Sequence, residues 1–159
     1  MNEFILDPNI ELSETFPELK LSYTLPLDSR TKVQITNPES AYQWLMKIWD
    51  KGTIQYKEEF LIILLNNSKY VIGWSKISSG GSNATIVEPA MVFQIALLAH
   101  ANSIILAHNH PSGRMVASSA DINLTKRLNE IGKILGLEID DHLIITLNGF
   151  LSLKTNELY

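Results

Sequence analysis

Apolar residues in this chain follow two patterns that alternate along the sequence. Short runs bounded by polar or turn-forming residues predict strands, and they lie at residues 58–65, 70–77, 103–107, 138–146 and 150–153. Apolar residues spaced three or four positions apart predict amphipathic helices, and they occur at residues 37–51, 89–101 and 118–135. Helices that alternate with strands favour an α/β fold, here a mixed β-sheet flanked by helices.

The first predicted helix and the strands after it carry recognisable end signals. Asn37 fits a helix N-cap and Pro38 fits the first helical position. Polar residues at 66–69 separate two predicted strands and indicate a β-hairpin. Residues 1–36 hold mixed short segments interrupted by prolines. We therefore expect a lead-in segment without a core of its own, followed by one domain over residues 37–159.

Length and composition narrow the possible chemistry. The chain has 159 residues, of which 45% are hydrophobic, which is ordinary for one globular domain. It contains no cysteine. Disulfides, thiolate-bound zinc and cysteine nucleophiles are therefore excluded, and histidine and carboxylate side chains are left as the means of binding a metal.

Charge and hydropathy bear on partners and location. The formal net charge is −4, and the 13 lysines and arginines are scattered along the chain. A protein that binds nucleic acid by neutralising phosphates would normally show a basic face, so we do not expect direct nucleic-acid binding. The N-terminal residues lack a targeting pattern, and no apolar run reaches bilayer length. We expect a cytoplasmic protein that does not interact with membranes.

Two histidines follow the predicted strand at residues 103–107. His108 and His110 are two positions apart, so their side chains point the same way in an extended chain. The Pro-Ser-Gly sequence at 111–113 turns the chain, and Asp121 then opens the next predicted helix. Two imidazoles and a carboxylate around one ion, with a free fourth position, describe a catalytic zinc site.

Asp121 also has an explanation that needs no metal. Ser118 and Asp121 precede a helical apolar stripe and fit a capping box. A His-x-His pair is likewise often structural. However, a helix N-terminus packed beside the end of a buried strand would bring Ser118, Asp121 and the two histidines around one small volume, which is how α/β proteins usually build sites.

The spacing of these residues resembles a known family motif. The sequence has His108 and His110, ten intervening residues and then Asp121, with Pro and Gly after the second histidine. It is similar to the JAMM motif of JAB or MPN domains. With Thr125 after the aspartate and His142 in a later strand, the pattern resembles the RadC-like branch. The resemblance implies a cytidine-deaminase-like JAB/MPN fold and a zinc metalloprotease.

The resemblance also implies a further acidic residue on an upstream strand, where the chain offers the neighbours Glu58 and Glu59. Strand alternation lets only one of them face the metal. The position two residues before Phe60 in the RadC-like pattern selects Glu58, and Glu59 is the alternative. In this interpretation, zinc lowers the pKa of a bound water toward neutrality. Glu58 is then the general base that passes the proton to the leaving nitrogen.

Other polar residues near the motif have more than one interpretation. Ser118 either donates to the oxyanion of a tetrahedral intermediate, as the family implies, or caps its helix. Asn109 points away from the ligands and is expected to fix the turn or to support a ligand by a hydrogen bond. We favour a structural role for His142 over a hydrogen bond to a ligand. His100 is expected to interact with its helix dipole and not with the metal.

These observations predict a zinc-dependent hydrolase of the JAMM class. Its substrate is expected to be a peptide or protein that is cut at a peptide or isopeptide bond, and a homo-oligomer is one option for its assembly. Two alternatives remain open. The first is an interaction module that keeps a metal site without turnover, and the second is a DNA-repair-associated accessory protein, because the RadC-like family carries a DNA-repair label.

Overall fold

A computed structural model describes residues 33–80 and 86–159 of the chain. Most of the predicted lead-in, residues 1–36, lies outside these ranges. Within its described part, Gln34 forms an isolated antiparallel bridge with Tyr70, and Ile35 is buried against the core.

The strands form one mixed sheet in the order β2-β1-β3-β4-β5. Their bounds are β1 Glu59–Leu65, β2 Val71–Ser79, β3 Ser103–Asn109, β4 Glu138–Thr146 and β5 Gly149–Ser152. Strand β1 pairs antiparallel with β2 and with β3, β3 pairs parallel with β4, and β4 pairs antiparallel with β5. The predicted hairpin is therefore confirmed, and so is the mixed α/β sheet.

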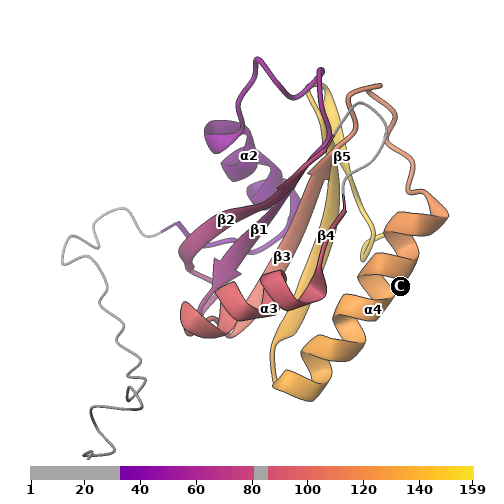
Figure 1. Ribbon diagram of the computed structural model, residues 1–159. Helices are drawn as coiled ribbons and strands as arrows, with labels where there is room; N and C mark the ends of the chain where they lie inside the picture. Colours follow the sequence, from indigo (N-terminus) through magenta and orange to yellow (C-terminus); the bar gives the residue numbers. More distant parts are fainter. Residues whose placement is uncertain (1–32, 81–85) are drawn as a thin grey trace, which may run out of the picture.

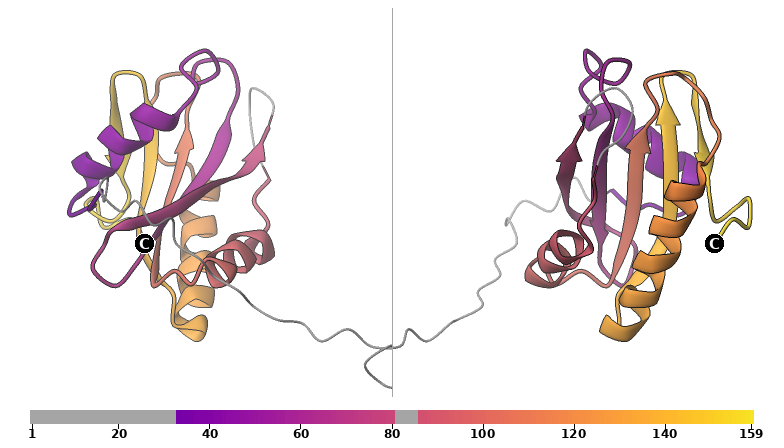
Figure 2. Two further views of the ribbon diagram at one scale, coloured as in Figure 1. Left: turned by 90° about the vertical axis from the view of Figure 1, so that its left-hand side faces the viewer. Right: turned by 45° about the vertical axis from the view of Figure 1, so that its right-hand side comes forward.

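Helices cover both faces of the sheet. They are α2 Pro38–Ile48, α3 Pro89–Leu98 and α4 Ser119–Leu135. Figures 1 and 2 show α2 on one face, whereas α3 and α4 lie on the other. Among the described residues, no helix combines the length and the apolar character needed to cross a membrane.

The central strands β1 and β3 are buried along their whole length. Alternate side chains supply two separate cores: Ile63 and Ile105 pack on the α2 side, whereas Ile62 and Leu106 pack on the side of α3 and α4. Helices on both faces explain why these strands are nearly continuous apolar runs. Each fully buried leucine or isoleucine contributes roughly 1.5–3 kcal/mol of burial free energy, so the ends of β1 and β3 are firmly placed.

Capping residues set the helix starts as the sequence predicted. Asn37 caps α2, and Ser118 caps α4 in a capping box with Asp121. Gly136 caps the C-terminal end of α4, and its positive φ of 70° is the left-handed conformation that glycine adopts readily. The helix predicted at residues 89–101 was too long at its C-terminal end, because α3 ends at Leu98 and not at residue 101. The chain leaves the helix at His100, which has a φ of 55°.

Candidate metal centre

The predicted pair of histidines lies where β3 leaves the sheet. His108 is within β3 and only 1% exposed, and His110 follows the strand and is half-buried. Both rings reach the side of the sheet that α4 covers, because residues two apart on a strand share a face. Their Nε2 atoms are 3.0 Å apart.

The first turn of α4 brings a carboxylate to the same place. Asp121 Oδ1 lies 3.3 Å from His108 Nε2, and Asp121 Oδ2 lies 3.9 Å from His110 Nε2. The ligand atoms of the three residues all lie within 4.8 Å of one another. His108, His110 and Asp121 therefore form a group that could hold a metal ion.

Asp121 serves the helix cap and this group at once. Its Oδ2 accepts hydrogen bonds from Ser118 N and Ser118 Oγ, each at 2.7 Å, and its own amide donates to Ser118 Oγ at 3.1 Å. The capping explanation and the ligand explanation are thus compatible, because the cap fixes the carboxylate that faces the histidines. In this arrangement the Ser118 hydroxyl proton points to Asp121.

Hydrogen bonds behind the two rings orient them. His110 Nδ1–H donates to the Arg114 carbonyl at 2.9 Å, so in the neutral ring the lone pair is on Nε2. His108 Nδ1 lies 2.8 Å from His142 Nε2, and His142 Nδ1 lies 2.6 Å from Thr125 Oγ1. This ring contact is the hydrogen bond to a candidate ligand that was the less favoured of the two expectations for His142.

The electrostatics of the site favour neutral imidazoles. Burial lowers the pKa of His108, and the positive form of His110 would lower it further, although Asp121 opposes the shift. Burial likewise puts the pKa of His142 well below its usual value, with smaller contributions from His108 and His110. Neutral rings are the form that binds metals.

Strand register decides how the two neighbouring glutamates lie. Phe60 of β1 is opposite His108 of β3, and the same antiparallel register, continued by two residues, would put Glu58 opposite His110. Glu58 accordingly lines an open groove of about 420 Å³ together with His110 and Ser118. Its carbonyl accepts from the Gly80 amide at 2.9 Å, so the segment after β2 approaches the site.

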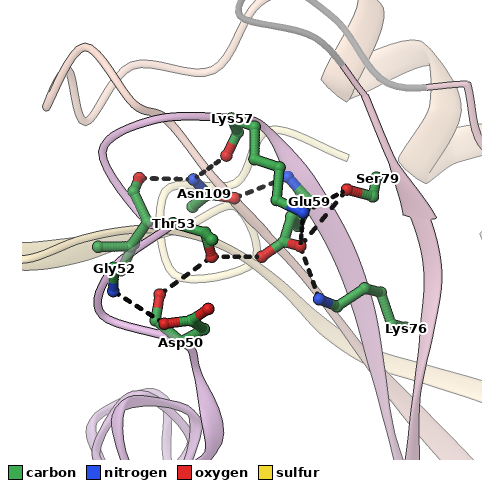
Figure 3. Close-up of polar contacts among 9 residues, drawn as sticks. Asp50, Gly52, Thr53, Lys57, Glu59, Lys76, Ser79 and Asn109 are labelled. Atoms are coloured by element: carbon green, nitrogen blue, oxygen red, sulfur yellow. Dashed lines mark hydrogen bonds and ion pairs between the residues drawn. The ribbon is translucent and has the colours of Figure 1, made fainter.

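Glu59 faces the other side of the sheet, where it is 1% exposed. Its carboxylate accepts hydrogen bonds from Lys76 Nζ at 2.6 Å and from Thr53 Oγ1 at 3.1 Å, and it pairs with Lys57 at 3.0 Å (Figure 3). Burial alone would raise the pKa of Glu59, but the hydrogen bonds and the charge of Lys76, with help from Lys57 and Thr53, lower it overall.

Asn109 joins the same network from β3. Its Oδ1 accepts from the Glu59 amide at 2.7 Å, and its Nδ2 donates to the carbonyls of Ile54 and Lys57 at 2.7 and 2.9 Å. Figure 3 shows Asn109 beside Glu59, between β3 and the loop before β1. Asn109 therefore fixes the loop that leads to Glu58 and not the turn after His110, for which a role had been expected. Thr53 and Lys76 were not singled out from the sequence, because nothing local marks them as partners.

The group meets the requirements of a zinc site. It offers two imidazole nitrogens and one carboxylate oxygen, a donor set used by catalytic zinc with a further position left for water or substrate. The hard, all-oxygen coordination that calcium and magnesium prefer does not match it. His108, His110 and Asp121 could therefore hold a transition-metal ion, and zinc is one that fits.

Comparison with known families decides the classification. Residues 35–158 match the RadC-like JAB domain family. The chain belongs to this family. Its sheet, its flanking helices and its His-His-Asp group agree with that membership.

Curated relatives share this domain and extend beyond it. A UPF0758 protein of Alkaliphilus metalliredigens is 40% identical over 92% of this chain and 62% of its own length. A UPF0758 protein of Clostridium acetobutylicum is 42% identical over 79% of this chain and 54% of its own, and one of Staphylococcus carnosus is 42% identical over 74% and 51%. The chain thus spans about half to three fifths of the length of these RadC-like relatives.

Proposed function

We propose that this RadC-like JAB domain is a zinc-dependent hydrolase that cleaves peptide or isopeptide bonds. The observation that carries the proposal is the convergence of His108 Nε2, His110 Nε2 and the Asp121 carboxylate within 4.8 Å, beside a groove lined by Glu58. A metal alone could serve structure. A metal-binding group that opens beside a carboxylate in a groove is what hydrolysis requires.

Zinc at these ligands would supply a Lewis acid that lowers the pKa of water toward neutrality and polarises a carbonyl. The chain supplies the geometry that this chemistry needs. The Ser118 cap holds the Asp121 carboxylate, the Arg114 carbonyl holds the His110 ring, and burial in β3 holds His108. Preorganised ligands of this kind cost little reordering during the reaction.

Glu58 is proposed as the general base. It lies on the histidine side of the sheet edge, opposite His110 in the extended strand register, and it lines the groove. From there its carboxylate would accept a proton from the attacking water and give it to the departing nitrogen. Glu59 is unsuited to this role, because its carboxylate is buried among Lys57, Lys76 and Thr53 on the opposite face.

Ser118 is proposed to stabilise the oxyanion. It is exposed and lines the groove, and its Oγ already accepts from the Asp121 amide. A serine oxygen that accepts from an amide still has a proton to donate. Rotation of that proton from Asp121 Oδ2 toward the groove would aim it at a substrate oxyanion without loss of the helix cap.

The surroundings of the groove suit an extended polypeptide. The groove is open and contains both apolar and polar side chains, among them Pro111, Val116 and Arg114. Strand β2 is an edge of the sheet, and it leads to Gly80, which contacts Glu58. An edge strand offers main-chain groups that can pair with an extended peptide. These features support a peptide or protein substrate.

Metal content tests the site. We expect wild-type protein to retain about one zinc per chain after purification, and we expect His110→Ala to lose it, as measured by elemental mass spectrometry. His100→Asn is the matched control, because it removes a histidine outside the group and asparagine tolerates the positive φ of that position. Absence of zinc in the wild type, or equal zinc in His110→Ala, would contradict the proposed site.

Cleavage of a peptide library, followed by mass spectrometry, tests the reaction. Glu58→Gln should keep zinc and a native circular dichroism spectrum but lower turnover by roughly 10²–10⁴-fold, which is the range for loss of a general base. Zinc binding in the wild type without cleavage of any peptide or isopeptide substrate would favour an interaction module. Full activity in Glu58→Gln would remove Glu58 from the mechanism.

A further inference from the structure

A line of buried polar groups extends from His108 to the backbone of α4. His142 on β4 and Thr125 on α4 are both 0% exposed. The Thr125 hydroxyl lies 2.6 Å from the Asp121 carbonyl and 2.6 Å from His142 Nδ1, and His142 Nε2 lies 2.8 Å from His108 Nδ1. The line therefore begins at one metal-ligand residue and ends at another.

The positions of the protons follow from donors and acceptors. A carbonyl only accepts, so the single proton of the Thr125 hydroxyl goes to the Asp121 carbonyl. The hydroxyl oxygen can then only accept from His142 Nδ1, which must carry hydrogen. The reverse direction would leave the Thr125 and Asp121 oxygens 2.6 Å apart with no proton between them.

The same reasoning continues to the metal ligand. A neutral His142 with hydrogen on Nδ1 has a lone pair on Nε2, so His108 must donate from Nδ1. The remaining lone pair of His108 is then on Nε2, the atom that faces His110 and Asp121. In a neutral His110 ring the Arg114 carbonyl imposes the same tautomer, so the two Nε2 lone pairs face each other at 3.0 Å, where a bound metal would lie between them.

Packing keeps the two rings in this arrangement. Phe60 stacks along His108, with ring centroids 6.1 Å apart and an interplanar angle of 9°. It also meets the His142 ring edge-on at 5.5 Å. His142 is fully buried, so in the folded protein bulk solvent does not compete with its Nε2 as the acceptor for His108 Nδ1–H.

We propose that His142 is a positioning residue: through Thr125 and the Asp121 carbonyl, it holds His108 as the Nδ1–H tautomer and so leaves Nε2 to bind the metal. The inference rests on the proposed metal site and adds a residue on β4 that contacts no ligand atom of that site. Partners behind metal-binding histidines commonly change metal affinity by 10–100-fold.

Paired substitutions separate positioning from packing. Thr125→Val is nearly isosteric but lacks the hydroxyl, whereas Thr125→Ser keeps the hydroxyl and loses a methyl group. We expect Thr125→Val to weaken zinc binding by about 10–100-fold and Thr125→Ser to stay within a few-fold of the wild type. Affinity would be measured by competition with a chromophoric zinc chelator, and folding by thermal circular dichroism. Equal affinity in the two variants would overturn the proposal.

A second pair acts on the histidine itself. The amide oxygen of His142→Gln can accept from His108 Nδ1–H, whereas His142→Leu has no acceptor. Zinc affinity should therefore be higher in the glutamine variant than in the leucine variant. A glutamine variant that binds zinc no better than the leucine variant would count against the proposed acceptor.

Nitrogen-15 NMR of the histidine rings identifies the tautomers in the wild-type protein, and the measurement does not depend on enzymatic activity. We expect protons on Nδ1 of both His108 and His142 in the wild type, before and after zinc is added. A proton on Nε2 of His142 would overturn the inference even if the protein binds zinc. Failure of the wild type to bind zinc would contradict the proposed function, while the tautomer measurement would still decide the direction of the hydrogen-bonded line.

Discussion

His108 and Asn109 are adjacent on β3 but face opposite sides of the sheet, and the two polar regions they join differ in how their charges are balanced. On the Asn109 side, the buried Glu59 carboxylate meets Lys76, Lys57 and Thr53 (Figure 3). On the His108 side, the described residues bring two ring nitrogens and a carboxylate oxygen together, and all of these are atoms that bind cations.

The difference separates a structural network from a group that could hold a metal ion. In the Asn109 network, each of the three amide contacts of Asn109 ends on a main-chain group, so the network fixes the chain that leads into β1. In the ligand group, the hydrogen bonds of His110 and Asp121 to Arg114 and Ser118 orient the ligands and leave His110 Nε2 and Asp121 Oδ1 toward the centre. The Asn109 network holds the chain that leads into β1, and the His-His-Asp group depends on strands that are held in place in this way.

Removing Asn109 should have the largest effect on stability. Asn109→Ala leaves the Glu59 amide and two carbonyls without their partner in a buried place. Each such group costs about 1–3 kcal/mol, and we expect a total loss near 3 kcal/mol in the free energy of unfolding, measured with urea. Zinc affinity should change by less than tenfold. A stability equal to that of the wild type would mean that the network does not support the fold.

Zinc should stabilise the folded protein through the opposite region. At a free zinc concentration of about 100 times the dissociation constant, the gain is about 2.7 kcal/mol, because the ion binds the folded state and not the unfolded one. Differential scanning calorimetry with zinc and with a chelator measures it. His110→Ala should lose this gain, and Asn109→Ala should keep it. A gain that persists in His110→Ala would place the zinc elsewhere.

The pH dependence of stability should report on Glu59. Its pKa is lowered from the usual 4.5, so the folded state favours the ionised carboxylate. The resulting stabilisation is fully present above the unfolded pKa and is lost as the pH falls through the lower folded pKa. Stability should thus fall below about pH 4.5. Glu59→Gln should be less stable at pH 7 by about 2 kcal/mol and less sensitive to acid. An unchanged acid profile in that variant would remove Glu59 as the cause.

The smallest effect tests the cap that touches the site. Ser118→Ala should cost about 1 kcal/mol of stability, because it removes the N-cap of α4. Asn37→Ala is the control, since Asn37 caps α2 in the same way away from the ligands and should cost a similar amount. Isothermal titration with zinc should show weaker binding in Ser118→Ala and no change in Asn37→Ala. If Ser118→Ala and Asn37→Ala bind zinc with equal affinity, Ser118 does not support the metal site, and its remaining roles are the helix cap and contact with the substrate.

Much of the fold followed from local signals. The starts of α2 and α4 were predictable from Asn37 and Ser118, because a capping side chain acts on amides two or three residues away. The end of α3 was not predictable, because the residue with the left-handed conformation is His100 and not a glycine, which usually marks such a helix end. The shared face of His108 and His110 followed from strand alternation, which is also a local property.

The placement of the two glutamates needed more than local pattern. Alternation shows that Glu58 and Glu59 face opposite sides, but it does not say which side holds the histidines. The pairing of Phe60 with His108 settles that point and puts Glu58 on the ligand side. The side-chain partners of Glu59 come from a loop and from β2, so no spacing within β1 could reveal them.

What the sequence alone determined is the set of elements, their caps and the shared face of His108 and His110, because each depends on neighbours along the chain. Only the tertiary structure placed His142 behind His108. In the pairing of β3 with β4, Ile104 is opposite Ile139, but Ile105 is already opposite Asp141. This one-residue irregularity reverses the faces of the residues that follow it. Without it, alternation from Ile139 would turn His142 away from the ligand side, so the contact depends on how two strands pair.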